Sequence, residues 1–243
     1  MAAGDADADR DADADRDADA DGDGDVDGDA DGDADGDGDV DADADEDAVG
    51  DADDPAAACR AIAPSPEAAV NHAVITACLG DHGIADLAPG TFPISESIDM
   101  PAGAVLRGGD TWPRIQMTSP EQAVVRTGDG SEVAFLRLDG NHQMTVPHAA
   151  VVMLEGNDAF VHDCHVQDGE GSVGDHHTVG VRFWTTTTTG NHVFRCQIHH
   201  NHYGVIFDLY PNGTDNLLEG CEIYENRCDG VTFRGYGRAV DNV

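Results

Sequence analysis

A repeated strand pattern in the last third of the chain restricts its fold more than any other feature. The segments 180–183, 204–207 and 230–233 share the pattern Gly-Val-x-Phe. Between them, the segment 193–198 returns as 218–223, each time with a Cys at its fourth position. Repeats of about 25 residues indicate a solenoid, in which each unit lies on the next and buries a shared core.

The periodicity extends upstream, so we expect about five coils over residues 123–243. Each coil has a first strand that begins at a Val, followed by a second strand in which apolar and polar residues alternate. Alternation with a period of two places one face inward and the other outward. Stacked coils therefore form columns of like side chains along the axis.

Two of these columns can be named from the alignment. Cys164, Cys196 and Cys221 share an inward position with Leu136, which predicts a small buried apolar stack rather than a metal site. A second set follows the second strand at matching offsets, and it predicts a ladder in which amide side chains satisfy backbone groups of the turns. Its members are Asn141, Asn201 and Asn226.

The first 54 residues differ from the rest, because Asp occupies every odd position from 5 to 47. In an extended chain these carboxylates lie on one side, about 7 Å apart. Their repulsion, and the small apolar area of Ala and Gly, predict a disordered and extended acidic tail. An EF-hand is excluded, because no acid stands at the twelfth loop position together with the Gly that the loop requires. Diffuse binding of Ca²⁺ stays open, and Ca²⁺ is our one cofactor candidate.

The charge of the chain excludes some classes of partner. A formal net charge of −37 predicts no affinity for nucleic acid or for anionic membranes. No apolar run reaches the roughly 18 residues of a membrane span. No signal peptide follows Met1, and the last coil stops without a cap, so we expect a mis-assigned start or a fragment, with a truncated C-terminus.

Residues 55–122 form the region that leads into the coils. Ser65, Pro66 and Glu67 are typical of a helix start, and Gly80 is typical of a helix end, so we expect a helix of about 13 residues. Cys59 and Cys78 flank this helix. They are candidates for a disulfide if the protein is exported, and otherwise they stay free.

Two motifs after the helix resemble those of a known superfamily. The segment 88–92 reads A-P-G-T-F, and the segment 101–108 reads P-A-G-A-V-L-R-G. With the preceding helix they resemble the start of the pectate-lyase-like superfamily, over roughly residues 62–243. The resemblance implies an all-β fold, a right-handed parallel β-helix whose open end the helix covers. It also implies a location outside the cell, secreted or on the surface, and a polysaccharide or cell-surface glycan as partner.

The resemblance implies two kinds of catalytic site, because the superfamily contains two kinds of polysaccharide-cleaving enzyme. Pectate lyases use calcium-binding Asp residues and an Arg base, and polygalacturonases use paired carboxylates. The paired-Asp signature is absent from this sequence. Asp208 and Arg234 on adjacent coils are the nearest analogue of the lyase arrangement.

The outward positions near the ends of the first strands align in one column. Glu155, Trp184, Asp208 and Arg234 occupy it in chain order. A sugar ring stacks on an indole, and carboxylates accept hydrogen bonds from its hydroxyl groups. We therefore predict Asp208, Arg234 and Glu155 as catalytic residues, and as substrate-binding residues Trp184, Arg182 and His202. An ordinary charge-balanced surface is the alternative.

Histidines form a second group of candidates. His176 and His177 lie in a long predicted turn, and one coil later follow His199, His200 and His202. Clustered imidazoles can bind a metal or act as general bases near neutral pH. Histidines in exposed turns are more often only polar, so we predict no metal site.

Two functions are consistent with these patterns. The first is an extracellular carbohydrate-binding or carbohydrate-active protein, with a polysaccharide lyase as its enzymatic form. The second is a non-catalytic surface or adhesive solenoid in which the acidic tail serves as a stalk.

Overall fold

A computed structural model describes residues 56–169, 178–184, 187–209 and 213–243, all within the unit Val49–Val243. The predicted acidic tail, its calcium alternative, and His176 and His177 lie outside the described residues. In the described ranges, no helix has the length and apolar character needed to cross a membrane.

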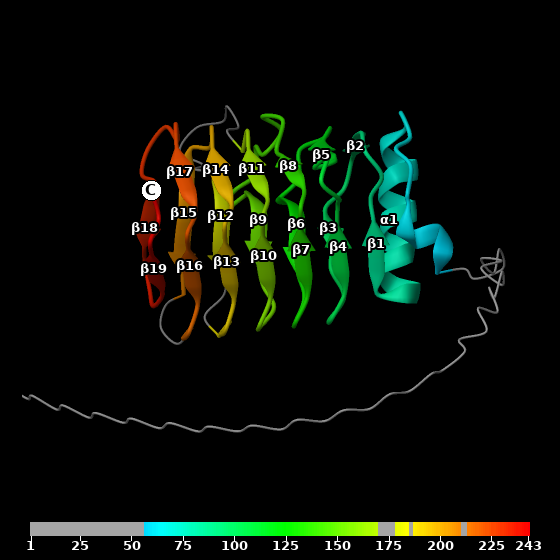
Figure 1. Ribbon diagram of the computed structural model, residues 1–243. Helices are drawn as coiled ribbons and strands as arrows, with labels where there is room; N and C mark the ends of the chain where they lie inside the picture. Colours follow the sequence, from blue (N-terminus) through cyan, green and yellow to red (C-terminus); the bar gives the residue numbers. More distant parts are fainter. Residues whose placement is uncertain (1–55, 170–177, 185–186, 210–212) are drawn as a thin grey trace, which may run out of the picture. The chain divides into compact units, whose positions relative to one another are not determined.

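Three parallel sheets wind into a solenoid, which confirms the predicted parallel β-helix (Figure 1). Sheet 1 contains β1 (Ile84–Asp86), β4 (Val105–Arg107), β7 (Glu132–Ala134), β10 (Phe160–His162), β13 (His192–Phe194), β16 (Leu217–Glu219) and β19 (Arg238–Val240). Sheet 2 contains β2 (Thr91–Ile94), β5 (Arg114–Met117), β8 (Arg137–Asp139), β11 (His165–Gln167), β14 (Gln197–His199) and β17 (Glu222–Tyr224). Sheet 3 contains β3 (Ile98–Asp99), β6 (Ala123–Thr127), β9 (Ala150–Leu154), β12 (Val179–Trp184), β15 (Tyr203–Asp208) and β18 (Val231–Phe233).

The second strand predicted for each coil is wrong in one respect, because it consists of two strands in different sheets. In one coil, β13 belongs to sheet 1 and β14 to sheet 2, with a corner at Arg195. Arg195 has a φ of 51°, and Phe135, Asp163 and Gly220 have similar positive φ values at the same corner. At this corner one residue in the left-handed backbone conformation turns the chain. The side chain of the next residue, which is a Cys in three coils, still points inward. The alternating pattern therefore continues through the corner and conceals it.

The interior consists of the predicted columns. Cys164, Cys196 and Cys221 are all buried, which confirms the apolar Cys stack. The Cys196 backbone N–H donates a hydrogen bond to the Cys221 sulfur at 3.5 Å. Burial raises the pKa of the Cys196 thiol well above its ordinary value, and the hydrogen bond with Cys196 raises the pKa of Cys221. These thiols therefore stay protonated and unreactive in the folded protein.

Asn side chains tie neighbouring turns together, as predicted for Asn141, Asn201 and Asn226, and Asn201 is buried. Asn226 Oδ1 accepts a hydrogen bond from the Asn201 backbone N–H at 3.0 Å, and its Nδ2 donates to Ile198 O at 3.0 Å. Asn141 Nδ2 donates to Met117 O. The repeated Gly of the first strand has its explanation here, since a Cβ on Gly180 would stand 2.7 Å from Asn201 Nδ2.

A second Asn ladder was not expected from the sequence. Asn191 Oδ1 accepts from the Ala159 backbone N–H at 2.9 Å, and Asn216 Oδ1 accepts from the Asn191 N–H at 3.1 Å. Asn216 Nδ2 donates to Thr188 O at 2.8 Å. Both Asn side chains are buried, so each amide replaces water for backbone groups that the turn leaves unpaired.

The helix α1 (Ala68–His82) packs against β1, β2 and β3 and covers that end of the solenoid, as the resemblance implied (Figure 1). It ends at Gly83, with a φ of 68°, and not at Gly80 as predicted. Its start is also different, because Ser65 does not cap it. Instead Asn71 Oδ1 accepts from the Ser65 backbone N–H, and Asn71 Nδ2 donates to Pro93 O in β2.

A short 3₁₀ helix, η1 (Ala57–Arg60), precedes α1. Cys59 in η1 and Cys78 in α1 form a disulfide, so the bonded alternative of the sequence analysis is the correct one. Both residues are buried in the same core as Ile75 and Leu79 of the helix. The disulfide therefore fixes the segment that closes the first coil.

Candidate functional site

The structure brings the predicted column together at the C-terminal ends of the sheet 3 strands. Trp184 of β12 pairs with Asp208 of β15. Glu155 continues the register of β9 beside Trp184, one position beyond the pair of Phe183 with Leu154. Arg234 follows β18, where its backbone N–H donates to Phe207 O at 2.8 Å. An indole thus lies between two carboxylate-bearing positions, with a guanidinium on the next coil.

Arg182 does not lie on the surface as predicted, because its side chain is only 2% exposed. Its Nη1 donates to His148 O at 2.7 Å, and its guanidinium carbon lies 5.0 Å from the centroid of the Trp184 ring. The Nε atom has no hydrogen-bond partner among the described residues. Burial lowers the pKa of Arg182 to about 10, against an opposing effect of Asp208. Arg182 therefore supports the indole from within and cannot contact a substrate directly.

The reason for this burial is an apolar cluster on the outer side of sheet 3. Met153 and Ile206 flank Arg182 in the register, and both are fully buried. They pack with small residues of the neighbouring strands and with Trp184 and Tyr203. The sequence contained an indication of this burial, because the apolar residues Met153 and Ile206 at outward positions indicate that this face of the sheet is covered.

His202 is not part of this column. It precedes β15, whereas Asp208 ends that strand, so the two residues lie roughly 20 Å apart by the rise of a strand. Its imidazole Nε2 lies 3.3 Å from the sulfur of Cys228, and its ring lies 5.0 Å from that of Tyr203. His202 therefore lies at a different place on the molecule, and its substrate-binding role stays a prediction.

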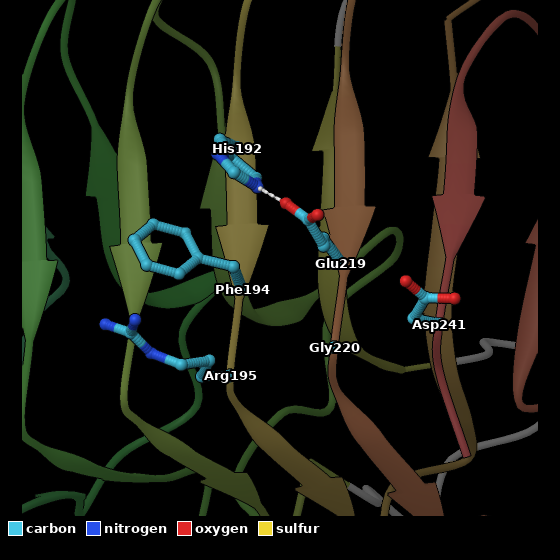
Figure 2. A pocket seen from close by; sticks show the side chains of 6 residues that line it. All are labelled: His192, Phe194, Arg195, Glu219, Gly220 and Asp241. Atoms are coloured by element: carbon cyan, nitrogen blue, oxygen red, sulfur yellow. Dashed lines mark hydrogen bonds and ion pairs between the residues drawn. The ribbon is translucent and has the colours of Figure 1, made fainter. Parts of the chain in front are cut away.

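Sheet 1 carries a cavity that sequence reasoning missed. It measures about 500 Å³ and lies on the outer side of β13, β16 and the segment after β19 (Figure 2). The residues that line it are His192, Phe194, Arg195, Glu219, Gly220 and Asp241. Outward positions of the second strand supply most of them, whereas the site predicted from the sequence lies on the first strand.

Paired charges and stacked rings organise this cavity. His192 Nε2 lies 3.0 Å from Glu219 Oε2, the contact drawn in Figure 2. Arg195 donates two hydrogen bonds to Asp163, at 2.9 and 2.6 Å, and this bond lowers the pKa of Asp163 while it raises that of Arg195. The Phe194 ring stacks on that of His162 at 4.7 Å. The lining of the cavity is acidic overall, because it contains two carboxylates, Glu219 and Asp241, and one guanidinium, Arg195, which is already paired with Asp163.

Rings also form a row on the outer side of sheet 2. Ring centroids lie 4.0 Å apart for Trp112 and His165, 6.4 Å for His165 and His199, and 4.9 Å for His199 and Tyr224. His165 Nε2 is buried without a hydrogen-bond partner in the part of the chain that the structure describes. Burial, with smaller effects of Arg137 and His199, lowers the pKa of His165 to about 4.

This shift predicts a dependence of stability on pH. The folded pKa of His165, about 4, lies below the ordinary value of 6.5, so the unfolded chain binds the proton first. Stability should therefore decrease as the pH falls from about 6.5 to about 4, and His165 should add no further change outside this window. His199 acts in the same direction, since burial lowers its pKa as well. NMR titration of the His165 ring should give a midpoint near 4, and a midpoint above 6 would contradict the prediction. In His165→Gln, chemical denaturation should show a smaller loss of stability between neutral pH and pH 4.5.

No convergent group of three or more His, Cys, Asp or Glu side chains occurs in the described ranges. Comparison of the chain with protein-family models, with curated proteins and with solved structures gave no match.

Proposed function

We propose that this β-helix protein binds a polysaccharide outside the cell, along the ends of β9, β12 and β15 on sheet 3. The observation that carries the proposal is the position of Trp184, supported by the buried Arg182 and adjacent to Asp208. An indole held by a guanidinium beneath it is rigid, so little entropy is lost when a sugar ring packs against its exposed part. Carboxylates on both neighbouring coils can accept hydrogen bonds from the hydroxyl groups.

The spacing of the coils supports a polymer rather than a single sugar. Successive coils repeat at about 4.8 Å, so a chain lying along the axis meets equivalent positions on each. Glu155, Asp208 and Arg234 extend the surface on both sides of Trp184. The Cys59–Cys78 disulfide supports an extracellular location, because such bonds persist in oxidising compartments.

Binding is proposed in preference to lyase chemistry. A lyase needs a base that reaches the substrate. Arg182 has a pKa lowered to about 10, but its guanidinium is buried and hydrogen-bonded to His148 O. The buried Arg182 therefore does not serve as a base in this geometry. Arg234 is exposed, and we assign it to polysaccharide binding.

Glycan binding can be tested directly with the purified protein. Against a panel of neutral and acidic polysaccharides, with and without calcium, Trp184→Ala should weaken binding about tenfold or more, because aromatic anchors carry most of such affinity. Trp184→Phe should keep part of the affinity. Tyr224→Ala, which removes an exposed ring from sheet 2, is the matched control and should bind as the wild type does.

The same panel separates the alternatives. Unchanged binding in Trp184→Ala and Asp208→Ala would reject the sheet 3 site. Loss of binding in Phe194→Ala and Glu219→Gln instead would place the glycan in the cavity on sheet 1, which its concave shape makes the second candidate. No binding to any glycan would favour the non-catalytic adhesive solenoid.

A further inference from the structure

Cys228 is set apart from the other cysteines of the described chain. Cys164, Cys196 and Cys221 are free but buried in the interior stack, and Cys59 and Cys78 form the disulfide. Cys228 is free and exposed, in the turn before β18. Neither the core nor the proposed glycan surface uses this thiol.

The thiol has a proton acceptor beside it. Cys228 Sγ lies 3.3 Å from Nε2 of His202, which occupies the turn before β15 one coil earlier. In this pair the S–H donates and the imidazole nitrogen accepts, when His202 carries its proton on Nδ1. A thiol reacts as its thiolate, and an adjacent imidazole is the group that takes the proton in activated cysteines.

The backbone holds the two side chains in this position. The Cys228 N–H donates to His202 O at 2.8 Å, and the Arg227 N–H donates to Asn201 O at 2.9 Å. The Asn ladder fixes both turns, since the Asn201 N–H donates to Asn226 Oδ1. In the same turn, the Asp229 carboxylate accepts a hydrogen bond from Thr232 Oγ1 at 3.2 Å. The contact between Cys228 and His202 thus follows from the stacking of two coils and not from a flexible surface loop.

We propose that Cys228 and His202 form an activated thiol that exchanges with small disulfides of the glutathione class. His202 Nε2 takes the thiol proton, and Cys228 Sγ attacks one sulfur of the disulfide. The S–S bond of the reagent breaks, a mixed disulfide forms on Cys228, and the second sulfur leaves as a thiolate that recovers the proton from the imidazolium. The step is a reversible modification, and free thiol reverses it.

The buried cysteines provide internal controls. The pKa values of Cys196 and Cys221 are raised in the folded protein, and Cys164, Cys196 and Cys221 are all buried. A single site should therefore react in the native state. The reaction is independent of the proposed glycan surface, because His202 and Asp208 lie at opposite ends of β15.

The test uses the native full chain with oxidised glutathione. Intact mass and peptide mapping should show one adduct, on Cys228, and none in Cys228→Ser. His202→Asn should slow the reaction at pH 7 about tenfold or more, the range of general-base assistance. At pH 9, where hydroxide replaces the imidazole as base, its rate should approach that of the wild type. His200→Asn is the matched control, because His200 lies in the same turn and pairs with Glu225 instead.

Three results would overturn the proposal. One is the absence of an adduct on native protein. Another is an adduct on Cys164, Cys196 or Cys221 before denaturation. The last is an equal rate at pH 7 in His202→Asn and the wild type. Circular dichroism of each variant shows whether a changed rate follows from loss of the fold.

Discussion

Phe207→Ala should lower the free energy of unfolding by about 3–5 kcal/mol, the usual cost of removing a fully buried ring. Phe207 lies between two other rings of the same inward column, with centroids 4.2 Å from Phe183 and 4.6 Å from Phe233. The variant leaves a cavity that spans the contact between coils, and the strands on either side are held by backbone pairing and cannot close it. Chemical denaturation followed by circular dichroism measures the effect.

The matched control is Phe233→Ala in the same column. Among the described residues Phe233 stacks on one ring, and it is 49% exposed, so its loss should cost about 1 kcal/mol. Equal costs for the two variants would contradict the argument, because they would show that stacking within the column does not set the contribution of each ring.

Reduction of the Cys59–Cys78 disulfide should lower the free energy of unfolding by about 3 kcal/mol, the value expected for a loop of this size. The bond joins residues 19 apart and links η1 to the helix that covers the first coil. Breaking it frees the unfolded chain and loosens the cover over the apolar end of the solenoid. Denaturation curves with and without reductant measure the difference.

The double variant Cys59→Ala/Cys78→Ala serves as the control. Its stability should match that of the reduced wild type and should not respond to reductant. An identical curve for the wild type in both conditions would show that the disulfide does not limit the unfolding of the capped end. A response of the double variant to reductant would place the effect at other thiols.

The sequence predicted the features that repeat from coil to coil. The Cys stack and the Asn turn ladder could be read from spacing alone, because parallel strands in register put each side chain over its counterpart about 4.8 Å away. The order of Glu155, Trp184, Asp208 and Arg234 follows from the same rule. The roles predicted for these four residues stay predictions.

Three features were not predicted from the sequence: the corner between sheets 1 and 2, the burial of Arg182, and the cavity on sheet 1. The sequence pattern does not mark the corner at Arg195, because inward and outward side chains alternate through it without a break. The burial of Arg182 depends on a carbonyl at His148, 34 residues earlier in the chain. The cavity on sheet 1 includes Asp241 and Glu219, which line it together because the corners of successive coils are superposed.

The sequence by itself determined that this chain forms stacked parallel coils, since a column of like residues is a local property repeated at a fixed interval. Only the tertiary structure decided which outward faces are covered and which stay open. Coverage is set by turns of neighbouring coils, such as the turn at His148 that lies against Arg182. Alternation along a strand distinguishes the two faces of a sheet without showing what lies against either.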